Sequence, residues 1–266
     1  MDNKGILWSI QQGSGPLLAT AIHHGHSLRA EVANRLYISE LERLREEDPH
    51  TGELTTIVDC QLIVHRSRFE MDINRDRSNA VYRVPADAWG LRVWQSPPDI
   101  ALIRRSLAQY DAFYQMLHGT LNTMLRTHPI VVVLDFHSYN HRRSGPDRPA
   151  DNPLRDPEIE IGTDTMDRQR WAPVVDNFKQ ALQRYTFNGR KLDVRENVKF
   201  GSGWMSRWIH SHFPYSVCAI SVELKKLFMD EWTGKLYPQM LNDYRQAFAS
   251  TIPGLIQICQ TFPSDV

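Results

Sequence analysis

Cysteine is scarce in this sequence: Cys60, Cys218 and Cys259 are the three among 266 residues. Three widely separated cysteines cannot form the framework of bridges that holds small disulfide-rich secreted domains together. Cys60 and Cys218 also lie within apolar, strand-like runs, where a buried and reduced thiol is the usual arrangement. The cysteine pattern therefore favours a protein of a reducing compartment.

An excess of charge and a long apolar run are also missing. Lys and Arg number 31 and Asp and Glu number 31, so the chain has no net field to attract nucleic acid or an anionic membrane. No segment approaches the roughly 18 apolar residues of a spanning helix. The start, Met1–Gly5, lacks the basic and then apolar pattern of a signal peptide. The sequence predicts a soluble cytoplasmic protein without nucleic-acid or membrane partners, and it does not define the oligomeric state.

Alternating strand-like and helix-like segments indicate the fold class. Uninterrupted apolar runs predict strands at 17–22, 57–64, 130–136 and 217–222. Amphipathic periodicity predicts helices at 27–46, 99–126, 169–186 and 236–250. Asp99 is a suitable N-cap for the second of these helices, which must end before Pro129. The alternation predicts one α/β domain over 1–266, with a mixed central sheet flanked by helices.

Histidines stand at the ends of two of these predicted strands. His137 follows the β-branched run Val131–Leu134, and His23 and His26 follow the apolar run Leu17–Ile22. In open α/β sheets, chemistry collects just outside the carboxyl ends of such strands. Each histidine alone is compatible with an ordinary strand end, but two strands that deliver imidazoles to one edge predict a metal centre.

The spacing suggests which histidines bind the metal. His23 and His26 are three residues apart across Gly25, whose conformational freedom would allow a tight turn that converges two imidazoles on one ion. His137 would complete a set of three ligands and leave one position open, as catalytic zinc requires. Zinc is the simplest choice of metal, and another divalent ion is also compatible. Glu31 is the alternative to His26 as second ligand.

Two further segments carry groups suited to hydrolysis. Asp72 could accept the second N–H of a ligating histidine, and Asn74 with Arg75 could hold a substrate carboxylate. The alternative for this segment is a solvated loop in an Arg/Asp-rich region. Glu223 ends the apolar run Val217–Val222, where a carboxylate is either costly or placed as a general base; we interpret it as the base.

In their order along the chain, four short segments resemble the N-formylglutamate amidohydrolase family. The segments are Ala21–His26, Asp72–Arg75, Asp135–Ser138 and Val222–Leu224, and the resemblance extends over about residues 16 to 235. The family is similar in fold and site to zinc carboxypeptidases and aspartoacylases. The resemblance implies a mixed sheet between helices, with one zinc ion at the strand ends.

The resemblance also implies roles for individual side chains. They are His23 and His137 as metal ligands, Asp72 as the partner of His23, Asn74 and Arg75 as binders of the substrate carboxylate, and Glu223 as the water-activating base. Carboxypeptidases have Glu at the position of His26, so His26 as a ligand depends on the spacing argument. The implied reaction is hydrolysis of an N-formyl or other N-acyl amino acid.

Three functions are compatible with these residues. The first is the acyl-amino-acid hydrolase, in which a second arginine would read a side-chain carboxylate; the candidates are Arg29, Arg66, Arg68 and Arg142. The second is a zinc carboxypeptidase that acts on peptides, since it would share every catalytic role. The third is a catalytically silent protein that binds acylated amino acids. The three histidines together with Glu223 argue against the third, because a silent protein would have no use for the base.

Overall fold

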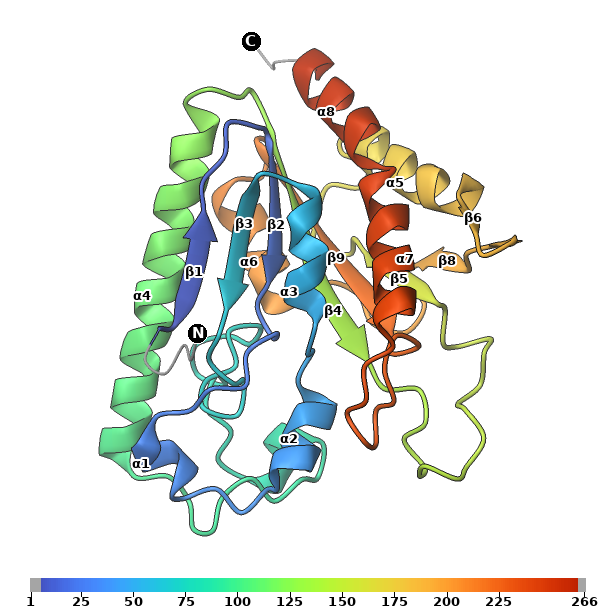
Figure 1. Ribbon diagram of the computed structural model, residues 1–266. Helices are drawn as coiled ribbons and strands as arrows, with labels where there is room; N and C mark the ends of the chain where they lie inside the picture. Colours follow the sequence, from blue (N-terminus) through green and yellow to red (C-terminus); the bar gives the residue numbers. More distant parts are fainter. Residues whose placement is uncertain (1–5, 263–266) are drawn as a thin grey trace.

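A mixed β-sheet runs through the centre of the computed structural model, which describes residues 6–262 of the chain (Figure 1). Its seven strands lie in the order β1-β3-β2-β4-β9-β5-β8. In chain order they are β1 (Trp8–Gln11), β2 (Leu17–Ala21), β3 (Cys60–Val64), β4 (Val131–Tyr139), β5 (Ile159–Gly162), β8 (Val194–Glu196) and β9 (Val217–Lys225). Four of them occupy the positions predicted for strands.

The middle of the sheet is parallel. Strand β2 pairs in parallel with β3 and β4, and β4 pairs in parallel with β9. Strands β1 and β5 are antiparallel to β3 and β9, and β8 is parallel to β5. All nine residues of β4 are buried, as its β-branched run predicted. The carboxyl ends of β2, β3, β4 and β9 therefore meet at one edge, the lower edge in Figure 1.

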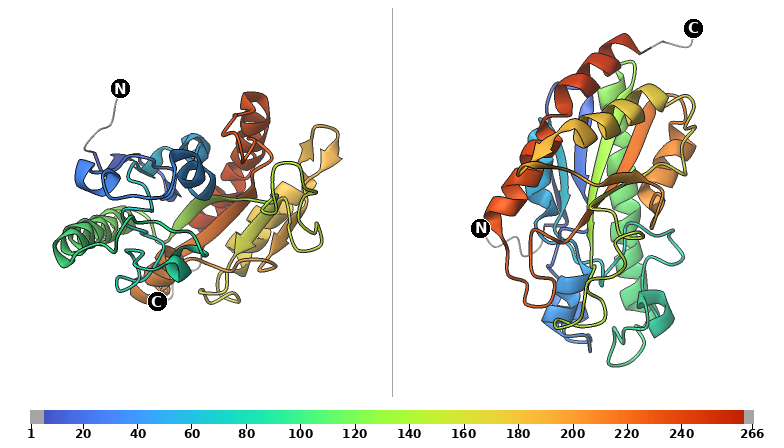
Figure 2. Two further views of the ribbon diagram at one scale, coloured as in Figure 1. Left: turned by 90° about the horizontal axis from the view of Figure 1, so that it is seen from below. Right: turned by 90° about the vertical axis from the view of Figure 1, so that its right-hand side faces the viewer.

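Helices cover both faces of the sheet (Figure 2). The helices α4 (Ile100–Leu125) and α6 (Trp204–His212) share an apolar cluster with Val131 and Val133 of β4. The alternate residues Val132 and Leu134 belong to the cluster on the opposite face. The helices of that face are α3 (Thr51–Leu54), α5 (Ala172–Arg184), α7 (Pro238–Ala249) and α8 (Ile252–Thr261). An α/β fold with a mixed central sheet between helices is thus confirmed.

One of the predicted helices is wrong. The segment 27–46 holds two short helices, α1 (Ala30–Ala33) and α2 (Glu40–Glu46), because the chain turns between them and Ser39 caps the second one. The other three predictions hold: α4, α5 and α7 lie within the predicted ranges. Asp99 caps α4 as expected, since its carboxylate accepts the Leu102 N–H at 2.8 Å.

Short elements complete the described part of the chain. They are the 3₁₀ turns η1 (Thr55–Ile57) and η2 (Pro85–Ala88) and the two-stranded ribbon of β6 (Thr186–Phe187) and β7 (Arg190–Lys191). Within residues 6–262, no helix has both the length and the apolar character needed to cross a membrane.

Candidate metal centre and active site

A cavity of about 200 Å³ opens at the edge where the parallel strands end. Strands β2, β4 and β9 deliver His23, His137 and Glu223 to it, and the chain after α2 delivers Asp48. The remaining lining residues are Glu46, Arg68, Asn74, Trp89, Ser138, Tyr139, Asn140, Arg143, Phe200 and Lys226. The fold thus gathers ionisable side chains from distant parts of the sequence.

Two buried histidines and one buried aspartate form the centre of this cavity. The imidazole rings of His23 and His137 lie 4.9 Å apart between centroids. The Asp48 Oδ2 atom lies 3.4 Å from Nδ1 of His23 and 3.0 Å from Nδ1 of His137. One potential ligand atom from each residue falls within 4.8 Å of the other two, a geometry that could hold a metal ion.

The second nitrogen of each ring is fixed by another carboxylate. Nε2 of His23 lies 2.7 Å from Asp72 Oδ1, and Nε2 of His137 lies 2.8 Å from Asp135 Oδ2. Because an ionised carboxylate only accepts, each Nε2 donates its hydrogen, and Nδ1 is the ring nitrogen that faces Asp48 and could bind a metal ion. The buried Nδ1 of His23 has no hydrogen-bond partner. This orphaned atom, together with the N, N and O donor set, fits a divalent metal such as zinc.

The electrostatics of the centre favour a positive charge there. Burial alone would raise the pKa of Asp48, but the adjacent imidazoles of His137 and His23 hold it below its usual range. Burial would likewise raise the pKa of Asp72, but the Arg68 guanidinium keeps it well below its ordinary value. Burial would lower the pKa of His137, but the neighbouring carboxylates raise it well above its ordinary value. The acidic cluster therefore stabilises a cation between the imidazoles, either a proton or a metal ion.

Glu223 lies beside this centre on the neighbouring strand. His137 and Glu223 are direct partners in the β4–β9 ladder, so their side chains lie on the same face of the sheet. Burial raises the pKa of Glu223 to about 8; the charge of His137 opposes this shift, and the charges of Asp48 and Asp135 add to it. A carboxylate with a raised pKa in a cleft has the properties of a general base.

His26 lies outside the cluster and does not line the cavity. Its Nδ1 contacts the Glu47 carboxylate, and its Nε2 lies 3.0 Å from the Arg43 guanidinium. After the turn that ends β2, Ser27 forms a parallel bridge with Arg66, and the Arg43 guanidinium of α2 donates to the carbonyl of His26, so His26 lies against α2. The spacing of three residues therefore does not produce the predicted convergence with His23.

Gly25 has a different role from the one expected. It does not adopt a positive φ angle. A Cβ atom at this position would instead lie 2.2 Å from the carbonyl carbon of His65, at the end of β3. Glycine is therefore required because two backbones approach closely here.

Asp48 was not among the predicted ligands. The polar, turn-rich segment that begins with Asp48-Pro49 is typical of a connecting loop between a helix and a strand. The signal present in the sequence was the run of three acidic residues Glu46-Glu47-Asp48. The structure buries all three, and acidic residues are rarely buried without partners. Asn140, Arg143 and Lys226 line the cavity and were also not identified.

The predicted substrate-binding residues are distributed around the cavity. Asn74 lines it, and its Oδ1 accepts the Met205 N–H at 3.0 Å. Arg68 also lines it, but its guanidinium is bound to Asp72 at 2.7 Å. Arg75 is not a lining residue: its guanidinium carbon lies 4.9 Å from the ring centroid of Tyr82 and 5.6 Å from that of Trp89, and its Nε lies 3.6 Å from Asp72.

Two residues predicted near the site lie elsewhere. Arg29 donates to Glu70 at 2.7 Å and to Ser106 at 2.6 Å, so its guanidinium supports the fold away from the cavity. Glu31, the alternative ligand, pairs with Arg105 at 2.8 Å on the surface. Both follow His26 closely in the sequence, but the chain after the turn that ends β2 does not bring them to the cavity.

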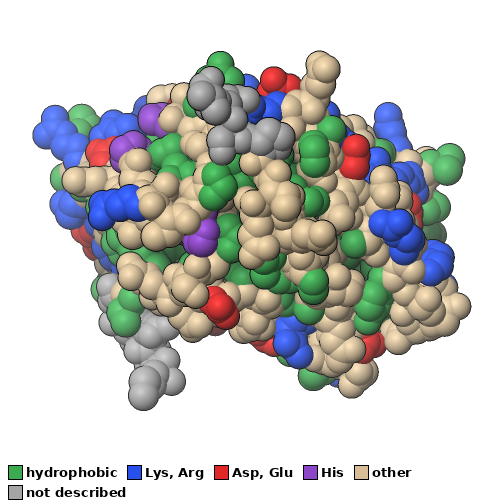
Figure 3. All heavy atoms as spheres, turned by 90° about the horizontal axis from the view of Figure 1, so that it is seen from above, with side chains coloured by type: hydrophobic (Ala, Val, Ile, Leu, Met, Phe, Trp, Pro, Cys, Tyr) green, Lys and Arg blue, Asp and Glu red, His purple; other side chains and the backbone are tan. Residues whose placement is uncertain are grey.

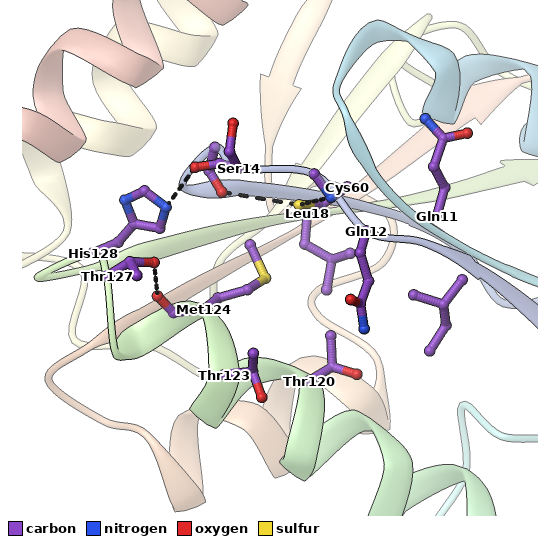
Figure 4. A pocket seen from close by; sticks show the side chains of 13 residues that line it. Gln11, Gln12, Ser14, Leu18, Cys60, Thr120, Thr123, Met124, Thr127 and His128 are labelled. Atoms are coloured by element: carbon purple, nitrogen blue, oxygen red, sulfur yellow. Dashed lines mark hydrogen bonds between the residues drawn. The ribbon is translucent and has the colours of Figure 1, made fainter.

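A larger cavity of about 310 Å³ lies at the opposite end of the sheet. Figure 4 shows Gln12 and Leu18 facing Thr120, Thr123 and Met124 of α4 across it. None of the described residues that line it is acidic, and its single histidine is His128. Acidic side chains are also few and scattered on the molecular end seen from above (Figure 3). We therefore place the chemistry at the smaller cavity.

Comparison with known proteins gives an independent result. The family model described as N-formylglutamate amidohydrolase matches residues 15–229. Among solved structures, the N-formylglutamate amidohydrolase from Ralstonia eutropha JMP134 is similar at 16% identity, with 96% of this chain and 98% of that chain covered and a TM-score of 0.71. Gene product Atu2144 from Agrobacterium tumefaciens is similar at 16% identity, with 98% and 96% covered and a TM-score of 0.65.

More distant similarity extends to the metallo-carboxypeptidase from Burkholderia cenocepacia, at 13% identity over 92% of this chain and 58% of that one, with a TM-score of 0.37. Curated protein sequences give no match. The Ralstonia and Agrobacterium structures share the fold of this chain, and the family model covers most of its residues. The match confirms the resemblance that the four segments predicted: the chain belongs to the N-formylglutamate amidohydrolase family.

Proposed function

We propose that this protein hydrolyses the amide bond of N-formylglutamate or a related N-acyl amino acid with the help of one divalent metal ion, most simply zinc. The observation that carries the proposal is the convergence of His23, His137 and Asp48 next to Glu223 in one cavity. Family membership supports an amidohydrolase. A cavity of about 200 Å³ suits a small substrate.

In this proposal, Nδ1 of His23, Nδ1 of His137 and the Asp48 carboxylate hold the metal. Asp72 and Asp135 orient the two rings through Nε2 and increase the basicity of the ligating nitrogens. A bound zinc ion would polarise the scissile carbonyl group and lower the pKa of water toward about 7. Two nitrogens and one oxygen from the protein leave a position open, as in catalytic zinc sites.

Glu223 is the proposed general base. It would take a proton from the attacking water and deliver it to the leaving nitrogen, and its position opposite His137 in the ladder supports this role. The products are a carboxylate and a free amino acid. A bound metal would lower the pKa of Glu223 below the value of about 8 that burial gives it without the ion.

We further propose that Arg143 binds the substrate carboxylate, with Asn74 beside it. Arg143 lines the cavity, its side chain is 46% exposed, and its guanidinium lies 3.5 Å from the Glu46 carboxylate. It is therefore less tightly held than Arg68, whose donors are bound within the protein. Arg75 stays a candidate for the same role, because its side chain lies beside Trp89, which lines the cavity, and a change of rotamer could bring its guanidinium into the cavity.

The metal ligands can be tested by elemental analysis and metal titration. We expect Asp48→Asn and His137→Ala to lose most of the bound metal, because each removes a ligand. We expect His26→Asn to keep it, since that ring contacts Glu47 and Arg43 instead. Full metal occupancy in Asp48→Asn together with loss in His26→Asn would reject our ligand set.

The substrate can be tested with N-formylglutamate and its α-methyl and γ-methyl esters. We expect hydrolysis of the free acid and a marked loss for at least one ester. Charge-assisted hydrogen bonds contribute about 1.5–3 kcal/mol, so Arg143→Ala should raise KM about ten- to a hundredfold. The matched variant is Arg75→Ala: the arginine whose substitution raises KM more is the one that binds the substrate carboxylate. Equal turnover of the acid and both esters would refute a carboxylate-binding site.

A further inference from the structure

Lys226 is a buried lysine that forms hydrogen bonds with the end of α2 and with strand β4, next to the candidate site. It follows directly after β9, the strand of Glu223, and its side chain is almost fully buried. Its Nζ donates to the backbone carbonyl of Arg45 at 2.5 Å and to that of Glu47 at 2.7 Å. Its backbone N–H donates to the carbonyl of Tyr139, just beyond His137 in β4, at 3.0 Å.

The two carbonyl groups belong to the C-terminal end of helix α2 (Glu40–Glu46). The last carbonyls of a helix have no partner within it, and a lysine ammonium group is a favourable partner because it also interacts with the helix dipole. The helix ends at this point, since Glu47 has extended backbone angles. Lys226 therefore fixes the direction in which the chain leaves α2, one residue before Asp48.

The segment that leaves α2 is unusually acidic for its burial. Glu46, Glu47 and Asp48 are 7%, 0% and 2% exposed. Consecutive buried carboxylates repel one another and are costly without compensating cations and hydrogen bonds. The Lys226 ammonium group supplies a positive charge against the backbone of this segment, so it offsets part of that cost.

We propose that Lys226 is a positioning residue for Asp48: by holding the backbone on both sides of Glu46, it directs the Asp48 carboxylate between His23 and His137. The inference rests on the proposed function only in taking Asp48 as a metal ligand. Strand β9 then supplies the base Glu223, and the residue directly after the strand is the lysine that holds a ligand.

Other bonds hold Asp48 from the opposite side, so the effect of Lys226 is partial. The Asp48 N–H donates to the carbonyl of His23 at 3.0 Å, and the Thr51 hydroxyl donates to the carbonyl of Asp48 at 2.7 Å. Loss of Lys226 would leave these contacts and release the segment at the α2 end. Reduced metal affinity, rather than loss of the fold, is the expected consequence.

The test is the Kd for Zn²⁺ alone, measured on folded protein by competition with a chelator at low temperature. Substitution of groups that orient metal ligands typically costs ten- to a hundredfold in affinity, and we expect a rise in Kd of about that size in Lys226→Met. The matched control is Lys225→Met, whose ammonium group contacts the carbonyl of Asp156 and does not line the cavity. Its Kd should change by less than about twofold.

A double-mutant cycle separates positioning from general destabilisation. If Lys226 acts through Asp48, then Lys226→Met should have almost no effect on Kd in an Asp48→Asn background. General destabilisation lowers Tm but leaves the Kd of the folded fraction unchanged. Lys226→Arg retains the charge and donors and should recover part of the affinity. Should Lys226→Met fail to fold, Lys226→Gln, which can still donate to a carbonyl, should show an intermediate Kd.

Two results would overturn the proposal in different ways. An unchanged Kd in Lys226→Met or Lys226→Gln, or effects that add fully with Asp48→Asn, would exclude the role of Lys226 and leave the proposed function intact. Wild-type protein that binds no zinc or other divalent metal would overturn the metal centre and the role of Lys226 together.

Discussion

Acidification should destabilise this protein through His210, a buried histidine remote from the proposed metal centre. The residue lies on α6 and is 7% exposed. Its Nε2 accepts the backbone N–H of Ala219 in β9 at 3.0 Å, and its Nδ1 lies 2.9 Å from the Thr165 hydroxyl. Protonation would place a hydrogen on the nitrogen that must accept, so it would break the bond to Ala219. Burial lowers the pKa of His210 to about 4.

The size of the effect follows from the difference in pKa between the two states. The unfolded chain takes up its proton near pH 6.5 and the folded protein only near pH 4, so the unfolded state gains protons first as the pH falls. The contribution is complete above pH 6.5 and is lost progressively down to pH 4. Proton linkage gives a loss of about 2 kcal/mol at pH 5 and about 3 kcal/mol below pH 4.

Urea unfolding of chelator-treated protein at pH 8, 6 and 5 measures this loss. The comparison variant is His210→Gln, whose side-chain oxygen can replace Nε2 as the acceptor for Ala219 and does not titrate. The wild-type advantage over the variant should shrink by about 2 kcal/mol between pH 8 and pH 5. The partly buried His24, whose pKa is also lowered to about 4, titrates in both proteins and cancels. An advantage that is constant with pH would refute the assignment to His210.

Three further substitutions test the site and its supports. Glu223→Gln should lower kcat about a hundred- to ten-thousandfold while metal content is retained, as measured by steady-state kinetics and elemental analysis; loss of metal would make Glu223 a ligand. Gly25→Ala places a Cβ 2.2 Å from the His65 carbonyl carbon and should destabilise by about 1–3 kcal/mol in urea unfolding; unchanged stability would contradict the close approach. The Glu160 carboxylate accepts hydrogen bonds from the backbone N–H groups of 198–200, and Glu160→Gln weakens these bonds, so limited proteolysis should cleave this loop faster. An unchanged rate of cleavage would show that these bonds do not hold the loop in place.

The strands were predictable where burial dictates the residue type. The β-branched run of β4 is covered by helices on both faces, and a fully buried strand of this kind has no polar alternation to confuse it with a helix. The cap of α4 was equally clear, because Asp99 precedes a long amphipathic stretch and its carboxylate accepts the Leu102 N–H. The family resemblance followed from residues at the ends of such strands.

The segment 27–46 was interpreted wrongly because its apolar stripe continues across a break. Leu28, Leu36 and Leu44 follow a helical period, but helices α1 and α2 are separate. A local signal for the break was present: Ser39 and Glu42 form a capping box, in which each side chain binds the backbone N–H of the other residue. A capping box within a run of helical periodicity therefore indicates that a new helix begins there, even where the periodicity alone predicts one continuous helix.

The proposed metal ligands divide in the same way between what local sequence determines and what only the fold determines. His23 and His137 could be identified because strand direction alone brings the ends of β2 and β4 to one edge. Asp48 follows the end of helix α2. In our proposal its carboxylate reaches the imidazoles because Lys226, which is distant in sequence, binds the carbonyl groups at the end of this helix. The spacing of three residues between His23 and His26 favoured His26 instead. Such local spacing carries no information about a ligand that a tertiary contact brings to the site. The ligand that the sequence did not reveal is therefore the one whose position depends on a side chain from another element, and for that reason Lys226 is the residue whose substitution best tests how the centre is built.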